Sequence, residues 1–483
     1  MSAAQVWATL AIYFAIGVLV AWLSRRGHRA DMSGYFLGQR RMGGLVSALS
    51  YSATTYSAFM MVGLAGLTYM GGVGALGFEI IYFAGVSLVA IFGPRFWRVG
   101  RAYDFITPSE MLGHRYASRG VAIAVALSSC LFLIPYAAVQ LAGVGYLMEG
   151  ATGEAIPFTT GVVLATVLAI VFSNVAGIRS VMWTDSLQAV VMIVTSVLAT
   201  AWVIHGLGGL DTLFGELARA QPQALAVPGE GFFSFKMFLG LTIPWFFFSL
   251  SNPQVSQRLY MPSSLRALRQ MLLGFLAFGF VYTLISVLWG FAARIVVPDL
   301  ASADLATPAL LASVHVPPLI GVIVIVAIMA AAVSTIDSIL ITLASMFSRD
   351  VYANLHAASD EKRQLLVGKL VIPVIALLAL AFAQLQLNLI AVLSVAASSG
   401  LVVVVPAIVG AFYWRRGSAA GALASIIGGG VFVLVVYAMG GSLWGIPAGI
   451  LGLPVAAFLF LLVSLFTRAP AQAEAFMRTA EAG

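Results

Sequence analysis

The sequence predicts an all-α membrane protein that crosses the bilayer many times. Of its 483 residues, 61% are hydrophobic and only 9% are charged, whereas soluble domains carry about a quarter charged residues. The mean hydropathy is +1.02. Apolar stretches of about 20 residues, long enough to cross the hydrocarbon core, recur from end to end. No polar stretch is large enough for a separate domain. We therefore expect one transmembrane unit over residues 1–468 and a short tail at 469–483.

Thirteen apolar segments are long enough to cross a bilayer as helices. The first runs straight into Arg25 and Arg26 without a small-residue cleavage site, so we interpret it as a retained span rather than a signal peptide. A short hinge at 384–387 separates the tenth span from the eleventh, and merging these two would give twelve. The predicted spans are 4–24, 45–70, 74–97, 121–148, 157–176, 182–206, 235–254, 270–294, 317–347, 365–384, 387–412, 419–439 and 445–467.

The basic residues predict the orientation in the membrane. With the N-terminus outside, all but three of the 25 Lys and Arg residues fall in inner loops or the tail, and Arg258 is counted among them. The exceptions are Arg219, Lys236 and Arg294. Positive charge stays cytoplasmic during insertion. We therefore expect an outer N-terminus and a cytoplasmic C-terminus in the plasma (inner) membrane, and we interpret the net charge of +7 as a topology signal rather than a nucleic-acid contact.

The residue types that carry enzyme chemistry are sparse. Cys130 is the only cysteine, so a disulfide framework and a thiolate metal cluster are excluded. The five histidines fall in predicted loops or at span ends, namely His28, His114, His205, His315 and His356. No pattern predicts a catalytic nucleophile or a metal centre. We therefore expect no enzyme, no cofactor and no obligate protein partner.

Three acidic residues, Glu79, Asp185 and Asp337, fall inside predicted spans. An ionisable group at membrane depth is costly and is by default a functional candidate. The span map places no Lys or Arg deep enough to neutralise them, so they predict a bound cation, a proton or a water-filled cavity. The alternative is a position nearer the interface, above all for Asp185, which lies only a few residues into its span.

The second span is the most polar of the apolar segments, with eight hydroxyl side chains between residues 47 and 57. Serine and threonine compete for backbone hydrogen bonds, so this run disfavours a continuous helix. Non-helical backbone in a membrane survives where it is buried in protein or lines a cavity, and its free carbonyls are suited to a small cation. A continuous helix whose hydroxyls bond their own carbonyls is about equally consistent with this segment.

The ninth span repeats small and hydroxyl residues at helical spacing. Ala331, Ser334, Thr335 and Ser338 share one face, with Asp337 at its edge. Small residues allow another helix to approach closely, so the two central hydroxyls are expected to offer oxygens to a cation shared with the second span. A packing seam of small residues is the alternative.

The seventh span is a second candidate for a broken helix, because Pro244 and Pro253 flank a polar run that ends at Asn252. The two discontinuities lie five spans apart. Units with an odd number of spans insert in opposite orientations, and paired interruptions in two halves indicate a transport site near the midplane. We expect core repeats at about 45–206 and 235–412.

Several short motifs occur together in a characteristic order. The sequence contains Gly34-Tyr35-Phe36-Leu37-Gly38 followed by Arg40-Arg41-Met42, then Gly63-Leu64-Ala65-Gly66, then Gly177-Ile178-Arg179-Ser180-Val181 with Thr184, Asp185 and Gln188, then Ser334-Thr335-Ile336-Asp337-Ser338, and finally Ser348-Arg349-Asp350-Val351-Tyr352. On these motifs the chain resembles the sodium:solute symporter family over roughly residues 4–465. The resemblance implies a leucine-transporter-type core of five plus five helices, with one helix before it and two after.

The resemblance also implies ligands for sodium. The main site would use backbone carbonyls of Ala53, Tyr56 and Ala331 and hydroxyls of Ser334 and Thr335. Asp185 matches an acidic position that the family associates with the sodium pathway. A second cation or a proton is therefore expected at Asp185, Asp337 and Ser338. Departures from the family pattern concern the solute: Thr55 stands where the proline branch has an aspartate, and Glu79 aligns loosely with a contact of the sialic acid branch.

The function expected from these residues is sodium-coupled symport of an amino acid, a monocarboxylate or a pantothenate-like solute by alternating access. The solute pocket is expected to comprise Thr54, Thr55, Ser57, Glu79, Gln140, Trp245, Phe248 and Asn252. One alternative is a proton-coupled carrier that uses Asp185, Asp337 or Glu79. Another is a solute sensor on a transporter scaffold, against which the short tail argues.

Overall fold

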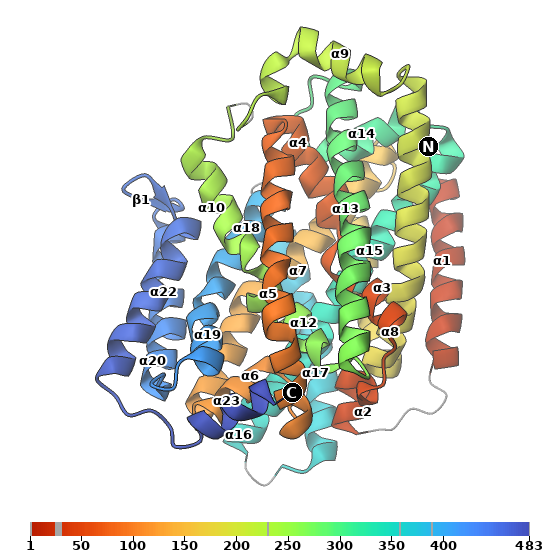
Figure 1. Cartoon of the computed structure of the whole chain (residues 1–483). Helices are drawn as coiled ribbons and strands as arrows, with labels where there is room; N and C mark the ends of the chain where they lie inside the picture. Colours follow the sequence, from red (N-terminus) through yellow and green to blue (C-terminus); the bar gives the residue numbers. More distant parts are fainter. Residues whose placement is uncertain (1, 25–30, 229–230, 357–358, 388–389, 483) are drawn as a thin grey trace.

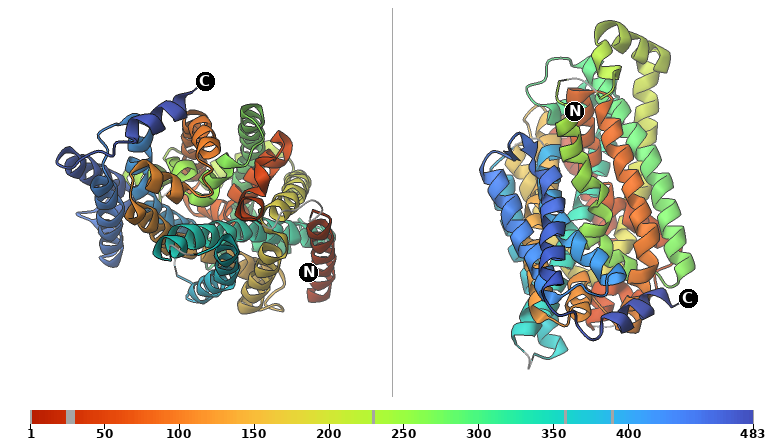
Figure 2. Two further views of the ribbon diagram at one scale, coloured as in Figure 1. Left: turned by 90° about the horizontal axis from the view of Figure 1, so that it is seen from below. Right: turned by 60° about the vertical axis from the view of Figure 1, so that its left-hand side comes forward.

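The chain folds as a bundle of long helices, and the computed structural model describes residues 2–24, 31–228, 231–356, 359–387 and 390–482. Arg25, Arg26 and His28 lie outside the described residues. Helix α15 is central, because 83% of the residues in the most apolar stretch of the ninth span are buried. Helices α20 to α22 lie on one side of the bundle and α1 lies on the opposite side (Figures 1 and 2). Helix α1 begins toward the end that carries α9, whereas α23 lies at the other end, as an odd number of crossings requires (Figure 1).

The secondary structure is almost entirely helical. The first half comprises α1 (Ala3–Ser24), α2 (Met32–Leu37), η1 (Gly38–Arg40), α3 (Gly44–Thr55), the π-helix η2 (Phe59–Leu64), α4 (Ala65–Gly71), α5 (Gly74–Ala102), α6 (Pro108–Arg115), α7 (Arg119–Ala151), α8 (Phe158–Gly206), α9 (Leu210–Ala220) and η3 (Pro222–Leu225). The middle comprises α10 (Phe235–Phe246), α11 (Phe248–Ser251), α12 (Pro253–Ser256), η4 (Gln257–Tyr260), α13 (Leu265–Val296), η5 (Ala303–Leu305), α14 (Ala306–Ala312), α15 (Pro318–Met346), the π-helix η6 (Phe347–Tyr352) and α16 (Ala353–Leu355).

The last third contains the one short hairpin among the described residues. It comprises α17 (Glu361–Ala383), α18 (Ile390–Leu401), η7 (Val402–Val404), α19 (Val405–Tyr413), α20 (Ala419–Leu423), the π-helix η8 (Ala424–Gly428), α21 (Gly429–Ala438), β1 (Ser442–Leu443), β2 (Ile446–Pro447), α22 (Ala448–Leu465) and α23 (Ala473–Glu481). Strands β1 and β2 are antiparallel, with Ser442 opposite Pro447. The predicted all-α membrane class is confirmed, since ten helices of the described chain are long and apolar enough to span a bilayer.

Each predicted span overlaps one helix or a run of consecutive helices, and the count of thirteen stays a prediction. The tenth and eleventh spans are distinct, because α17 ends at Ala383 and α18 begins at Ile390. The fifth and sixth are joined as α8, which bends at Gly177 (φ 64°, ψ −164°). A Cβ atom at this glycine would lie 2.6 Å from the carbonyl oxygen of Tyr35. A glycine is therefore required both for the backbone angle and for the close approach.

Both predicted helix breaks are confirmed, and the continuous helix considered for the second span is wrong. In that span α3 ends at Thr55, Tyr56 leaves the helical region (φ −88°, ψ 78°), and the chain resumes as a π-helix at Phe59. In the seventh span the extended Asn252 (φ −82°, ψ 114°) separates α11 from α12. A broken helix makes backbone carbonyls accessible to other partners, and at the first break the carbonyls of Ala53 and Thr54 accept hydrogen bonds from α15.

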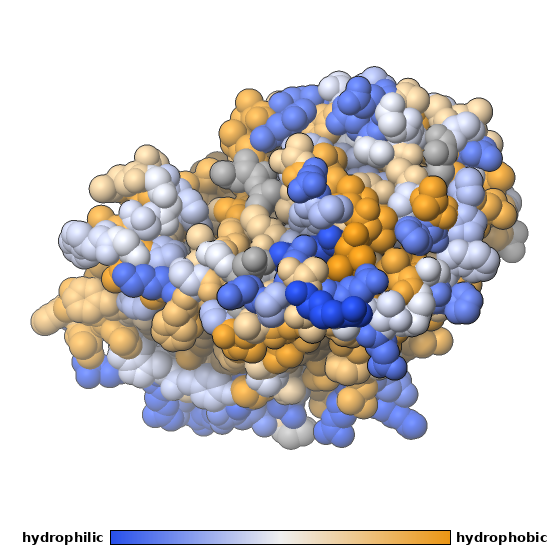
Figure 3. All heavy atoms as spheres, turned by 90° about the horizontal axis from the view of Figure 1, so that it is seen from above, coloured by the Kyte–Doolittle hydropathy of each residue, from blue (hydrophilic) through white to orange (hydrophobic). Residues whose placement is uncertain are grey.

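The segments that connect the spans are themselves folded. At one end, α9, η5 and α14 form a partly helical cover, and hydrophilic side chains lie among apolar ones on the face seen from that end (Figure 3). At the other end, the tail at 469–483 contains α23, whose Phe476 is fully buried. The domain limits and the two core repeats stay predictions.

Candidate functional site

The residues predicted to bind sodium meet where the second span breaks. Ser334 Oγ lies 2.9 Å from the carbonyl oxygen of Ala53 and 2.8 Å from that of Ala331. Thr335 Oγ1 lies 3.1 Å from the carbonyl oxygens of both Thr54 and Ala331. Hydroxyls of α15 thus face carbonyls at the end of α3 in a fully buried position.

This cluster has the chemistry of a site for a hard monovalent cation. Neutral hydroxyl and carbonyl oxygens are the ligands that unwound transporter helices offer to Na⁺. Tyr56, the remaining predicted ligand, caps α3, and its N–H bonds the carbonyl of Ser52 at 2.7 Å. Because the group joins α3 to α15, a cation bound there would hold these two helices together.

An arginine neutralises Asp185, which corrects the expectation that no basic residue lies deep in the bundle. Arg258 Nη2 donates to Asp185 Oδ2 at 2.8 Å and to Ser338 Oγ at 2.7 Å, and it also contacts Thr54 Oγ1. Ser50 Oγ donates to the same carboxylate oxygen at 2.7 Å. Asp185 is 0% exposed, so its carboxylate is buried inside the protein.

The assignment of Arg258 to an inner loop was wrong because the polar run before it resembles a loop. After Asn252 the chain turns helical again and continues through η4, all of it buried. The signal that could have located this arginine is the polar run after Asn252. No clear turn separates this run from the helix break, so it could have been predicted to stay inside the bundle. Ser50 was likewise missed, although it lies one turn before Thr54 on α3.

Asp337 differs from Asp185 in its partners. It faces α8, where Ser173 Oγ donates to its Oδ1 at 3.3 Å, and its Oδ2 has no partner among the described residues. Arg258 contacts Asp185 and not Asp337. Nearby, Gln188 Nε2 donates to the hydroxyl of Tyr13 on α1 at 2.6 Å. The two aspartates predicted to hold a second cation or a proton therefore differ. Asp185 has a basic partner in Arg258, whereas Asp337 has only a hydroxyl donor among the described residues.

The predicted solute residues fall into two groups. Glu79 on α5 accepts a hydrogen bond from Trp245 Nε1 at 3.2 Å. The rings of Phe59, Phe78, Tyr82 and Phe248 surround Trp245, with centroids 4.9, 5.4, 5.9 and 4.7 Å away. This group joins the two broken spans. By contrast, the Thr54 hydroxyl contacts Ser338 and Arg258.

Several other predicted solute residues are buried with unused polar atoms. Gln140 is fully buried, and neither its amide oxygen nor its amide nitrogen has a partner within the described chain. The same holds for Thr55 Oγ1 and Asn252 Nδ2. Ser57 Oγ instead accepts from the backbone N–H of Phe59 at 3.2 Å. Buried polar groups are rarely left unpaired, so these atoms have hydrogen-bonding capacity that the described chain does not use.

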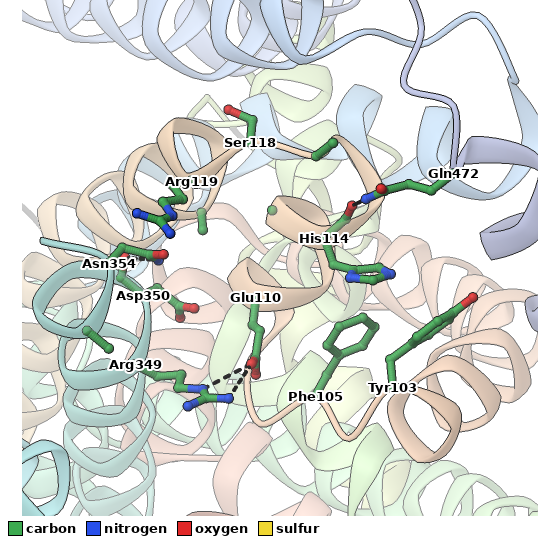
Figure 4. A pocket seen from close by; sticks show the side chains of 14 residues that line it. Tyr103, Phe105, Glu110, His114, Ser118, Arg119, Arg349, Asp350, Asn354 and Gln472 are labelled. Carbon is green, nitrogen blue, oxygen red and sulfur yellow. Dashed lines mark hydrogen bonds and ion pairs between the residues drawn. The ribbon is translucent and has the colours of Figure 1, made fainter. Parts of the chain in front are cut away.

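A cavity of about 510 Å³ lies elsewhere, at the end of the molecule that holds α23. It is lined by α6, the start of α7, the η6 and α16 segment that follows the ninth span, and Gln472 of the tail (Figure 4). Arg349 Nη2 and Glu110 Oε1 form an ion pair of 2.9 Å across it. Burial lowers the pKa of His114 in its wall, and the charge of Glu110 opposes this. None of the predicted site residues lines this cavity.

Comparison with known proteins assigns this chain to a family. A family model described as the sodium:solute symporter family matches residues 35–429. This chain belongs to the sodium:solute symporter family. It is 28% identical over 432 residues to the sodium/pantothenate symporter of Escherichia coli (strain K12), covering 87% of each chain. It is 26% identical over 454 residues to the sodium/proline symporter of Staphylococcus aureus, covering 89% of this chain and 85% of that one.

Among solved structures, a substrate-bound, outward-open Na⁺-coupled sialic acid symporter matches with a TM-score of 0.78 and 21% sequence identity, covering 97% of this chain and 98% of that chain. The likeness confirms the leucine-transporter-type fold. As a member of the sodium:solute symporter family, the protein is a multi-pass membrane transporter that performs sodium-coupled symport of a small organic solute.

Proposed function

We propose that one Na⁺ binds between α3 and α15 and prepares the solute site, so that solute and ion enter the cell together by alternating access. The observation that carries this proposal is the position of the Ser334 and Thr335 hydroxyls against the carbonyls of Ala53, Thr54 and Ala331. The carbonyl of Tyr56 completes the proposed ligand set. Sodium is the coupling ion, in a plasma membrane with the N-terminus outside.

The position of Arg258 supports a stoichiometry of one Na⁺ per transported solute. Its Nη2 is within 2.8 Å of Asp185 Oδ2 and 2.7 Å of Ser338 Oγ, two of the three residues expected to hold a second cation. A guanidinium at this position is itself a cation, and its charge would repel a second Na⁺. We therefore propose that the guanidinium of Arg258 takes the place of a second cation beside Asp185 and Ser338.

The energetics of one Na⁺ restrict the solute. A membrane potential of about 100 mV supplies roughly 2.3 kcal/mol per charge, and a tenfold Na⁺ gradient adds about 1.4 kcal/mol. Together they allow accumulation of a net-neutral solute of several hundredfold. For a monoanion the electrical contribution cancels, which leaves about tenfold. Of the three solute classes expected, an amino acid without net charge would be accumulated strongly, whereas a monocarboxylate or a pantothenate-like anion would be accumulated poorly.

The test is uptake into proteoliposomes with and without an inward Na⁺ gradient. We expect Ser334→Ala combined with Thr335→Ala to raise the Na⁺ concentration for half-maximal uptake at least tenfold, because two ligands are lost. Ser398→Ala is the matched control, since this buried hydroxyl on α18 donates to the carbonyl of Ser394 in its own helix. Unchanged Na⁺ dependence in the double variant would refute the assignment.

A proton-coupled carrier is the second candidate, favoured by the isolated carboxylate of Asp337. It predicts uptake that is driven by a proton gradient in the absence of Na⁺ and abolished by Asp337→Asn. Uptake that requires Na⁺ and persists in that variant would reject it.

A further inference from the structure

Glu79 is a carboxylate inside the bundle without a cationic partner. It is 1% exposed, and the ion pairs among the described residues do not include it. Trp245 Nε1 is its one hydrogen-bond donor in the described chain, at 3.2 Å. A neutral indole N–H does not compensate a buried negative charge, which requires an opposite charge, a metal or a proton. The folded protein therefore leaves this group's charge to be balanced by something else.

The surroundings of Glu79 indicate that the balancing group comes from the solute. The carboxylate lies on α5 beside the broken seventh span, and the rings of Phe78, Tyr82 and Phe248 enclose the same Trp245 that bonds it. Aromatic faces attract cations. The Glu79 carboxylate therefore attracts a compact ammonium group and repels a carboxylate of the same sign.

Two of the other unpaired groups are hydrogen-bond donors. Gln140 Nε2 and Asn252 Nδ2 are buried amide donors without partners among the described residues. Amide N–H groups suit a carboxylate oxygen. Gln140 lies one helical turn from Tyr136, whose ring is 5.7 Å from that of Phe248. Acceptor and donor groups are thus offered within one aromatic-lined region.

We infer that the transported solute is a zwitterionic amino acid whose ammonium group pairs with Glu79 and whose carboxylate is bound by the amides of Gln140 and Asn252. This inference rests on the proposed function and narrows its solute to one class. A zwitterion has no net charge, so one Na⁺ suffices for strong accumulation. Pantothenate and simple monocarboxylates have a carboxylate but no ammonium, and Glu79 would disfavour them.

The experiment uses the full chain in proteoliposomes with labelled L-alanine, L-leucine, L-proline, propionate, 4-methylpentanoate and pantothenate. Alanine with propionate, and leucine with 4-methylpentanoate, are matched pairs that differ by the amino group. We expect Na⁺-driven uptake of at least one amino acid. The matched acid without the amino group should inhibit this uptake with an apparent affinity at least 100-fold lower than that of the unlabelled amino acid. This comparison needs no variant, so it cannot be obscured by misfolding.

Glu79→Gln tests the charge itself, because glutamine has the shape of a protonated glutamate. We expect the apparent affinity for the amino acid to fall at least 30-fold, while stabilisation of the purified protein against heat by Na⁺ is unchanged. Glu216→Gln, on the exposed face of α9, is the matched control and keeps wild-type uptake.

The outcomes separate the inference from the function on which it rests. Na⁺-driven uptake of pantothenate or propionate, with the amino acids inactive, would overturn the zwitterion and leave sodium symport intact. Full affinity in Glu79→Gln would likewise overturn the ammonium pairing. Absence of Na⁺-driven uptake for every probe, together with no stabilisation by Na⁺, would instead refute the proposed function.

Discussion

Arg258 Nη2 lies 2.8 Å from Asp185 Oδ2, with side-chain exposures of 2% and 0%. The two residues belong to different predicted core repeats, since Asp185 lies on α8 and Arg258 follows the break of the seventh span. Their contact is shared with Thr54 on α3 and Ser338 on α15. A single guanidinium nitrogen therefore ties four separate segments together, one helical turn along α15 from the proposed sodium ligands.

Breaking this pair is expected to destabilise the protein more than removing it entirely. Loss of one partner leaves a buried, uncompensated charge, which typically costs about 3–5 kcal/mol, whereas neutral replacement of both is much milder. Arg258→Gln should therefore lower the thermal unfolding temperature in detergent, and adding Asp185→Asn should restore at least half of the loss. Arg415→Gln is the control, because its pair with Glu474 is exposed and worth less than about 1 kcal/mol. An additive double variant would contradict the pairing.

The sodium count should depend on the same arginine. If its guanidinium occupies the second cation position, the wild type transports one Na⁺ per solute, measured as the reversal potential in proteoliposomes. In Arg258→Gln the freed carboxylate of Asp185 is available to a cation, so the Hill coefficient for Na⁺ should rise from about 1 toward 2. A coefficient near 2 in the wild type would contradict this assignment.

The helix breaks and the polar face of α15 could be predicted from the sequence, because they depend on the length of apolar segments and on residue spacing. The two helix breaks were predictable because hydroxyl-rich and proline-bounded runs compete with helical hydrogen bonding, and they occur at Tyr56 and Asn252. The facing of Ser334 toward α3 followed from helical periodicity. Arg258 was not predictable in this way, because hydropathy counts an arginine as a loop residue regardless of a partner 73 positions away.

The hinge within α8 is expected to depend on Gly177 for two reasons. Its φ of 64° is unfavourable for other residues, and a Cβ would lie 2.6 Å from the Tyr35 carbonyl oxygen. Backbone with a positive φ and a ψ near 180° is essentially restricted to glycine and costs a residue with a side chain roughly 1–3 kcal/mol. Gly177→Ala should therefore reduce stability by more than Gly153→Ala, whose glycine has a similar φ of 59° but open space around it. Equal unfolding temperatures of the two variants would show that the clash is relieved at no cost.

The pH dependence of stability should contain a contribution from Asp304 between the eighth and ninth spans. Burial raises its pKa to about 6 from an ordinary 3.8, and the hydrogen bond from the Ile390 N–H opposes this only in part. The folded state thus binds more protons than the unfolded state between these values. The contribution to stability is fully present below about pH 3.8 and is lost as pH rises through 6.

The measurement is the unfolding temperature of the wild type relative to Asp304→Asn from pH 4.5 to 7.5. Asparagine keeps the oxygen that accepts from Ile390 but does not ionise. The wild type should lose stability relative to this variant as pH rises, with a change on the order of 2 kcal/mol across this range. Asp211→Asn, at an exposed side chain of α9, is the control. A difference independent of pH would exclude ionisation of Asp304 in this range.

The tail helix α23 is expected to depend on one aromatic side chain. Phe476 is fully buried against the rings of Phe412 and Tyr103, at 5.5 and 6.0 Å, and so joins the tail to α19 and α5. An isolated helix of nine residues is unstable in water, so Phe476→Ala should release and unfold the tail. Hydrogen exchange over 473–481 should then lose its protection, while Arg478→Ala, at a side chain that is 75% exposed, should preserve it. Retained protection in Phe476→Ala would mean that the polar contacts, Tyr103 to Thr479 at 3.1 Å among them, suffice to dock the helix.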